Sequence, residues 1–171
     1  PSTRPYNPAG CGGNGECPSR TAVDGNGDVW VANRAFSHQG SVTKIANVAC
    51  PDSDGDGLIT TSHDADGDGR IDRGSPEEFP GDRDECVLFT VPVGQGASVP
   101  RALALDAGSL EGGSEGSAWV GLFEGRQLVK LRNTDGAVLL AVDLPYYDND
   151  PNLGRMQPYG AAIDRRGRIW M

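Results

Sequence analysis

Two short segments of this 171-residue chain carry aspartates at alternate positions, and both have the same spacing. The first segment begins at Asp52 and the second at Asp64, twelve residues later. Each has Asp at positions 1, 3 and 5, Gly at position 6 and Ile at position 8. Carboxylates at alternate positions can turn toward one point only where the backbone coils tightly, and the Gly permits that turn. The pattern therefore predicts two oxygen-lined calcium sites in tandem.

Each predicted site takes its ligands from positions 1, 3, 5, 7 and 9, with a backbone carbonyl at position 7. Thr60, at position 9 of the first loop, is expected to coordinate directly or through water. The predicted ligands of about two Ca²⁺ ions are Asp52, Asp54, Asp56, Leu58, Thr60, Asp64, Asp66, Asp68, Arg70, Asp72 and, after the second loop, Glu77.

Position 12 departs from the calcium loop of an EF-hand, where a bidentate Glu is required. His63 holds this position in the first loop and Ser75 in the second. We expect His63 to face solvent, because calcium prefers oxygen ligands. Asp64 can bridge the two sites and so supply the first loop. The candidates for the second loop are Glu77, Glu78, Asp82 and Asp84.

The flanks of the two loops also disfavour the helices of an EF-hand, since Pro51 precedes the first loop while Gly74 and Pro76 follow the second. Residues 50–86 instead resemble the aspartate-rich calcium repeats of thrombospondin type 3 and, more distantly, dockerin loops. This resemblance implies calcium binding but no particular biological function.

The net charge of the chain is concentrated in this segment, which holds twelve acidic and three basic residues and has a net charge of −9. The whole chain also has a net charge of −9, so the rest is neutral. The alternative to a metal site is a solvated acidic loop.

Nucleic acid is an unsuitable partner because no basic stripe is present to contact phosphates. A membrane span is not expected, because apolar runs such as 137–142 are only strand-sized.

Four cysteines indicate disulfide bonds rather than a metal or haem site, since no zinc-finger or haem-attachment spacing occurs. Cys50 and Cys86 bracket the acidic segment, while Cys11 and Cys17 bound a short Gly-rich loop. We predict these two pairs from proximity, although four cysteines allow three pairings. An even number of cysteines beside calcium loops favours an extracellular or periplasmic location.

A hairpin pattern occurs three times outside the acidic segment, over residues 19–31, 100–120 and 158–171. Each copy has a strand of small and apolar residues, an Asp, a turn and a strand centred on Trp. The Asp and Trp pairs are Asp24 with Trp30, Asp106 with Trp119, and Asp164 with Trp170. We expect the Trp residues to pack between neighbouring repeats rather than to bind a ligand.

Third strands are predicted at 41–45 and 127–131, and fourth strands at 87–93 and 137–144. Four strands per repeat predict an all-β fold made of antiparallel β-propeller blades, with a calcium-binding insert between the third and fourth strands of the first blade. The predicted units are an N-terminal segment (1–18), a first blade (19–49 and 87–93), the insert (50–86), a second blade (101–144) and the start of a third (158–171).

These units amount to about two and a half blades, whereas a closed propeller has at least four. We therefore expect either a fragment of a longer chain or self-assembly through open sheet edges. In such a meander, the loop at 34–40 and the connections at 94–100 and 145–158 share one end, and the insert lies at the other.

Residues 19–171 apart from the insert resemble the secreted bacterial propellers related to NHL repeats and to streptogramin (virginiamycin B) lyase. The resemblance implies a module that binds a protein or polysaccharide or acts as a scaffold. Alternatives are a lyase-like or lactonase-like enzyme with most of its catalytic residues outside this segment, and a structural subunit of an extracellular assembly. The lyases use His and Glu, but His38 has no evident partner, and we assign no catalytic residue.

Overall fold

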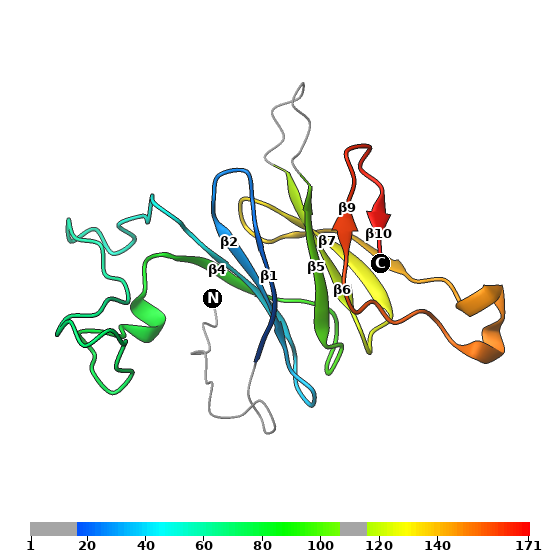
Figure 1. Ribbon diagram of the computed structural model, residues 1–171, viewed down its shortest axis with the longest axis horizontal. Coiled ribbons are helices and arrows are strands. Elements are labelled where there is room, and N and C mark those ends of the chain that lie inside the picture. Colours follow the sequence, from blue (N-terminus) through cyan, green and yellow to red (C-terminus); the bar gives the residue numbers. More distant parts are fainter. Residues whose placement is uncertain (1–16, 107–115) are drawn as a thin grey trace.

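The computed structural model describes residues 17–106 and 116–171. Its strands form two four-stranded antiparallel sheets and one two-stranded hairpin, and its helices are short 3-10 turns. Figure 1 shows the two sheets side by side, with the insert of residues 50–86 extending from one end of the molecule and the loop of residues 144–158 from the other. The predicted all-β class and the four-stranded antiparallel sheets are confirmed, and the described residues do not close into a ring.

The first sheet is a simple meander in which every strand pairs with its neighbour in sequence. Its tight β1–β2 turn depends on Gly27, which has a φ of 87°, and on Asp24, which accepts the backbone N–H groups of Asn26 and Asp28 at 2.9 and 3.1 Å. The strands are β1 (Cys17–Val23), β2 (Val29–Arg34), β3 (Ser41–Ile45) and β4 (Val87–Pro92).

The second sheet repeats this meander, and its first strand has a register shift after Pro100 that corresponds to the shift after Pro18 in β1. Its strands are β5 (Pro100–Asp106), β6 (Ser117–Leu122), β7 (Gln127–Arg132) and β8 (Val138–Asp143). The remaining elements are the hairpin β9 (Ala162–Ile163) and β10 (Ile169–Trp170), and the turns η2 (Gly81–Arg83), η3 (Tyr147–Asn149) and η4 (Pro151–Leu153).

The hydrophobic core lies between the two sheets and draws on both of them. Trp30 is fully buried there and meets the ring of Phe89 edge to face, with the ring centroids 5.4 Å apart. The predicted packing role is thus confirmed for Trp30. Trp170, in contrast, is 60% exposed, because its hairpin has only two short strands.

The repeated Asp and Trp pairs have a structural explanation. In the first sheet the indole N–H of Trp30 donates to Asp24 at 3.1 Å. Trp119 donates in the same way to Asp106 at 2.9 Å, and the third pair has a longer distance of 3.3 Å. Each Asp therefore connects the end of one strand to the Trp of the next strand.

Lys44 on β3 extends this network to the second sheet. Its ammonium group lies 3.2 Å from Asp24 and 3.1 Å from Asp28, and it donates to the side-chain oxygen of Asn133 at 2.7 Å. In the second sheet, Lys130 is 3.7 Å from Asp106 and more exposed. The first sheet thus buries a fully partnered lysine, which satisfies the charge.

The insert leaves the first sheet between β3 and β4, and its two ends are joined by the predicted disulfide between Cys50 and Cys86. The backbone N–H of Ala46 donates to the carbonyl of Cys86 at 2.8 Å and continues the pairing of these strands beyond the sheet. The predicted bond between Cys11 and Cys17 lies outside the described residues. Within the described part of the chain, no helix is long and apolar enough to cross a membrane.

Candidate metal centres

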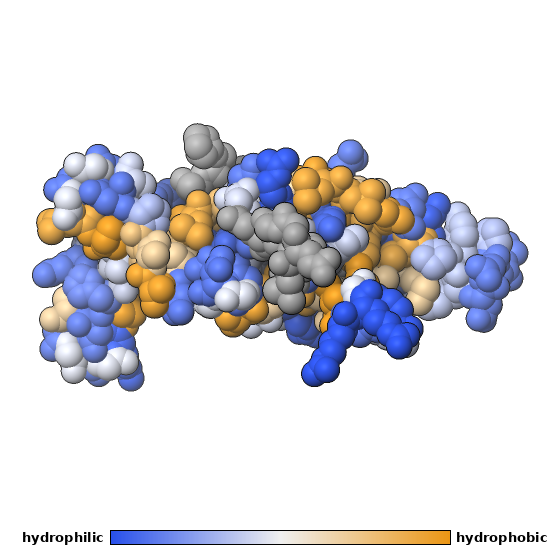
Figure 2. Space-filling view, turned by 90° about the horizontal axis from the view of Figure 1, so that it is seen from above, coloured by the Kyte–Doolittle hydropathy of each residue, from blue (hydrophilic) through white to orange (hydrophobic). Residues whose placement is uncertain are grey.

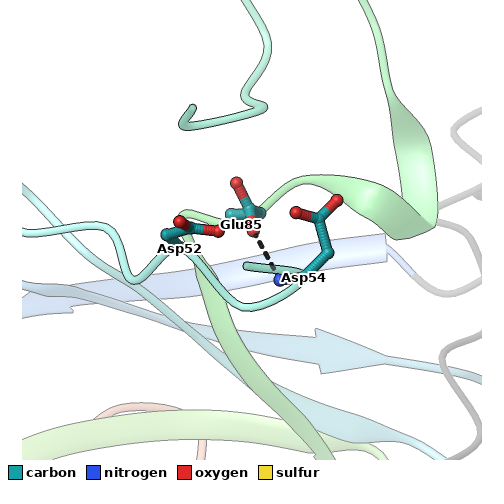
Figure 3. Close-up of side chains that lie close together, drawn as sticks. All are labelled: Asp52, Asp54 and Glu85. Carbon is teal, nitrogen blue, oxygen red and sulfur yellow. Dashed lines mark hydrogen bonds between the residues drawn. The ribbon is translucent and has the colours of Figure 1, made fainter. Parts of the chain in front are cut away.

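Two groups of three carboxylates in the insert bring one oxygen of each member within 4.8 Å of the others. The first group contains Asp52, Asp54 and Glu85 (Figure 3), and the second contains Asp64, Asp66 and Glu78. In both groups the aspartates are exposed and the glutamate is buried, with 5% of its surface accessible. Each group therefore has two ligands from a loop and a third from a more distant segment.

The aspartate at position 1 shapes each loop. Asp52 accepts the backbone N–H groups of Gly55 at 2.7 Å and Gly57 at 2.9 Å, one on each carboxylate oxygen. Asp64 accepts those of the equivalent glycines of the second loop, both at 2.8 Å. The four glycines have φ between 76° and 85°, a region that strongly favours glycine. The glycines at position 4 are thus as important to the coil as the predicted glycines at position 6.

The aspartates at positions 3 and 5 continue the coil. One oxygen of Asp54 accepts the N–H of Asp56 at 3.1 Å, and one oxygen of Asp56 accepts that of Leu58 at 2.8 Å. Asp66 and Asp68 make the same contacts in the second loop, at 3.0 and 2.8 Å. Because one oxygen of each carboxylate fixes the backbone, the other is available as a candidate metal ligand.

Glu85 closes the first loop from a position 33 residues after Asp52. One of its oxygens accepts the N–H groups of Ser53 at 2.6 Å and Asp54 at 3.2 Å, and the other accepts that of Thr60 at 2.8 Å. These hydrogen bonds, with that of Thr60 the strongest, hold the pKa of Glu85 below its usual range. Glu85 is therefore a buried, ionised carboxylate at the centre of the loop.

Glu78 takes the same place in the second loop. It accepts the N–H of Asp72 at 2.7 Å, and Asp72 occupies position 9, as Thr60 does in the first loop. The carbonyl of Glu78 also accepts the N–H of His63 at 3.1 Å. The two loops are thus built alike, and each has a glutamate in place of the residue that position 12 lacks.

The structure brings together four of the eleven predicted ligands. Glu77 is exposed and lies in neither group, whereas Glu78, an alternative for the same role, is in the second. Glu85 was not among the candidates; its place next to Cys86 was the available signal, because the disulfide returns it to the start of the first loop. The predicted carboxylate ligands Asp56, Asp68, Asp72 and Glu77 lie outside both groups. Leu58, Thr60 and Arg70 are predicted as carbonyl or hydroxyl ligands, which these groups of carboxylates do not test.

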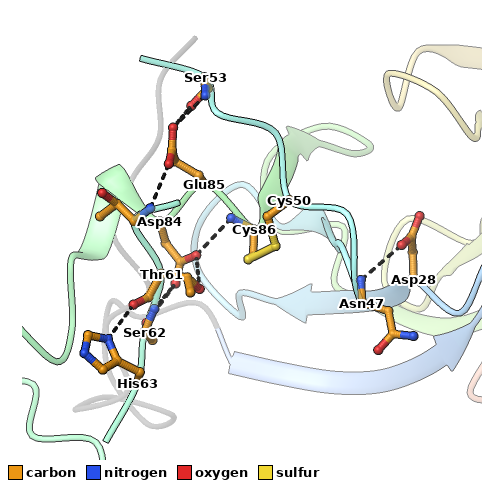
Figure 4. The surroundings of a disulfide bond; sticks show 11 residues. Asp28, Asn47, Cys50, Ser53, Thr61, Ser62, His63, Asp84, Glu85 and Cys86 are labelled. Atoms are coloured by element: carbon orange, nitrogen blue, oxygen red, sulfur yellow. Dashed lines mark hydrogen bonds between the residues drawn. A yellow bond between two sulfur atoms is a disulfide. The ribbon is translucent and has the colours of Figure 1, made fainter. Parts of the chain in front are cut away.

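Asp84, also a candidate ligand of the second loop, has a structural role instead (Figure 4). It accepts the hydroxyl of Thr61 at 2.9 Å, the N–H and hydroxyl of Ser62 at 3.1 and 2.8 Å, and the N–H of Cys86 at 3.1 Å. His63 is exposed, as expected, and its Nδ1 lies 3.1 Å from the carbonyl oxygen of Thr61. Asp84 therefore connects the end of the first loop to the disulfide.

The charge of the insert is not balanced by its own arginines. All the ion pairs found among the described residues lie outside residues 50–86. Backbone N–H groups, that of Gly69 foremost, hold the pKa of Asp64 below its usual range, so this carboxylate is ionised at neutral pH. The donors in both groups are carboxylate oxygens, which suit a hard cation such as Ca²⁺ or Mg²⁺ rather than a soft metal.

No protein-family model, curated protein or solved structure matches this chain. The arrangement of its residues is therefore the basis for the function proposed below.

Proposed function

We propose that the insert binds two calcium ions and that the chain is an extracellular calcium-binding module of β-propeller type, which binds another macromolecule or serves as a scaffold. The observation that carries this proposal is the pair of equivalent loops. Each has two exposed aspartates and one buried glutamate within 4.8 Å, coiled by the same hydrogen bonds. No base among the described residues pairs with these acids.

Calcium fits these loops better than magnesium does. Ca²⁺ accepts six to eight oxygen ligands in flexible geometry, whereas Mg²⁺ requires near-ideal octahedral coordination and tends to keep its water. Three carboxylates, together with a further aspartate and a carbonyl from the same loop, supply such a set. Asp56 and Leu58 are the expected additional ligands in the first loop, and Asp68 and Arg70 in the second.

An extracellular location is supported by the disulfide at the base of the insert, since such bonds persist in oxidising compartments. The insert buries few side chains, so we expect a bound ion to be a source of its stability. Figure 2 shows it at one end of the molecule as a largely hydrophilic surface with separate hydrophobic spots. Leu58, for example, is 69% exposed, so the loops have no core of their own.

The propeller assignment is supported by two meanders of four strands that share one core, and by the recurrence of the Asp and Trp hydrogen bond. It is consistent with the resemblance to NHL-repeat and streptogramin lyase propellers described above. A binding or scaffold role is the simplest function for such a module.

Calorimetric titration of the metal-free chain with Ca²⁺, Mg²⁺ and Zn²⁺ tests the proposal. We expect two Ca²⁺ ions to bind, with Mg²⁺ at least tenfold weaker and no Zn²⁺ in either loop. At a free calcium concentration of 100 times the dissociation constant, each bound ion should stabilise the fold by about 2.7 kcal/mol, and EDTA should remove this gain.

Glu77→Gln is the matched control, because this exposed acid lies beside Glu78 but outside both groups. It should retain both ions. A chain that binds no calcium, and whose melting temperature is the same with calcium and with EDTA, would exclude the proposed function.

A further inference from the structure

Three arginines on the sheets have no carboxylate partner among the described residues. Arg20 lies on β1, Arg34 on β2 and Arg101 on β5, and all three are half-buried. A half-buried charge without a counter-charge is unfavourable, so these positions differ from the rest of the sheets. The basic residues that do pair with an aspartate are Lys44, Lys130, Arg132, Arg155 and Arg168.

The strand register brings the three arginines to one region. Arg20 is paired with Ala32, and Arg34 follows Ala32 by two residues, so both point to the same side of the first sheet. Ala32 is fully buried in the core that also contains Leu103 of β5. That side therefore faces β5, the strand that carries Arg101. Strands β1 and β5 begin at the same end of the molecule (Figure 1).

Tyr159, which precedes β9, connects two of these arginines. Arg101 donates to its hydroxyl at 2.7 Å and lies over its ring, with the guanidinium carbon 4.0 Å from the ring centroid. The guanidinium carbon of Arg20 lies 4.9 Å from the same centroid, and Phe123 meets Tyr159 edge to face at 6.2 Å. The hydrogen bond from Arg101 is also the main reason that the pKa of Tyr159 is lowered. The aromatic ring thus fixes two cationic groups side by side.

The region has more hydrogen-bond donors than acceptors. The Nε atoms of Arg34 and Arg101 are buried and have no acceptor among the described residues. Glu124, which follows Phe123, is exposed and lies 3.4 Å from the side-chain nitrogen of Gln157 rather than from an arginine. An acceptor with negative charge is therefore the group that this region lacks.

We propose that Arg20, Arg34 and Arg101 bind an oxyanion, a carboxylate or a sulfate or phosphate group, carried by a ligand or partner of this chain. Guanidinium groups bind such planar or tetrahedral oxyanions through paired N–H donors. These charge-assisted hydrogen bonds are stronger than hydrogen bonds between neutral groups. The site is separate from the insert. The insert adjoins the β1–β2 turn, where Asn47 donates to Asp28 at 3.1 Å, at the opposite end of β1. Anion binding at the three arginines therefore does not depend on calcium binding by the insert.

The test is a titration of the calcium-loaded chain followed by NMR, which detects the Nε–H groups of arginine side chains directly. Sodium sulfate and sodium glucuronate serve as the two probes, at constant ionic strength, with glucose as the neutral control. We expect saturable shifts of the Nε–H signals of Arg20, Arg34 and Arg101. Saturation with sulfate alone assigns the site to sulfate or phosphate groups, and saturation with glucuronate alone assigns it to carboxylates; either supports the proposal.

Arg101→Gln should weaken binding at least tenfold. Arg132→Gln should leave it unchanged, because Arg132 is exposed and already pairs with Asp135 at 2.9 Å. If Arg101→Gln does not fold, Arg20→Gln and Arg34→Gln provide the same comparison. Shifts that stay linear with both anions, or equal affinity in the wild type and in the folded arginine variants, would overturn the proposal.

Discussion

The sheets and the insert differ in what fixes their structure: burial of side chains in the sheets, and hydrogen bonds from the backbone to exposed carboxylates in the insert. In the sheets, Trp30 and its neighbours are removed from water, and even a buried charge such as that of Lys44 has three partners. In the insert most side chains are exposed, and carboxylates accept backbone N–H groups instead of pairing with bases. The comparison shows that one chain can specify structure by burial in one region and by concentrated charge in another. Among the described residues, only the second region contains candidate metal ligands, so we expect a cation to stabilise the insert and not the sheets.

The largest effect is expected where the sheets bury charge. Lys44→Met leaves Asp24 and Asp28 without their base, and their side chains are only 7% and 16% exposed. We expect a loss of about 3–5 kcal/mol in the free energy of unfolding, as for other broken buried ion pairs. Urea unfolding in the presence of calcium measures it.

Lys130→Met is the matched control in the second sheet. Lys130 is 30% exposed and 3.7 Å from its aspartate, so we expect a loss of about 1 kcal/mol or less. Equal losses for the two variants would contradict the view that burial, rather than the presence of an ion pair, determines the cost.

A smaller effect is expected from the disulfide that joins the two ends of the insert. Replacing both Cys50 and Cys86 by Ala opens a loop with a sequence separation of 36 residues. The chain-entropy estimate for a loop of this length is a loss of stability of about 2–4 kcal/mol. Because calcium would still hold the loops, the loss should increase when EDTA is added. A loss that is identical with and without calcium would show that the disulfide and the loops are not coupled.

The stability of the first sheet should depend on pH through Asp24, which lies outside the insert. Burial raises the pKa of Asp24, but the hydrogen bonds from Trp30 and Lys44 outweigh it, so the pKa lies below its usual range. The stabilisation from Asp24 is therefore full above its unfolded pKa of about 4 and is lost as the pH falls through the lower, folded value. Asp24→Asn lacks this titration.

The stability difference between the wild type and Asp24→Asn should thus decrease as the pH is lowered below about 4. Unfolding is measured in EDTA, so that release of calcium by acid does not contribute. A difference that stays constant over this range, or increases, would show that Asp24 is not stabilised in its ionised form.

The sequence predicted those features that depend on local spacing. The Asp and Trp repeats gave the hairpins, and the alternating aspartates gave the tight coils of the two loops. It did not predict Glu85, which reaches the first loop only through chain closure at the disulfide, or the contact between Lys44 and Asn133, which joins two sheets. The position of Glu85 beside Cys86 was the only signal for the first contact, and the second has no sequence pattern, because both depend on how distant segments pack.

Trp170 shows that a correctly predicted motif does not determine whether its side chain is buried. Its sequence context matches that of Trp30, yet its side chain is largely exposed, since burial depends on a neighbouring sheet rather than on the motif. The same reasoning applies to Glu77 and Glu78, adjacent acids of which only one is buried. Local patterns identified which segments carry ligands, but burial decides which residue within them takes part.

The most direct test of the central claim is the calcium stoichiometry of two glutamate variants, measured by calorimetry. Glu85→Gln and Glu78→Gln retain an acceptor oxygen for the backbone but remove one charge from the first and second group, respectively. We predict two ions for the wild type, one high-affinity ion for each single variant, and none for the double variant. Two ions bound with unchanged affinity by the double variant would contradict the account.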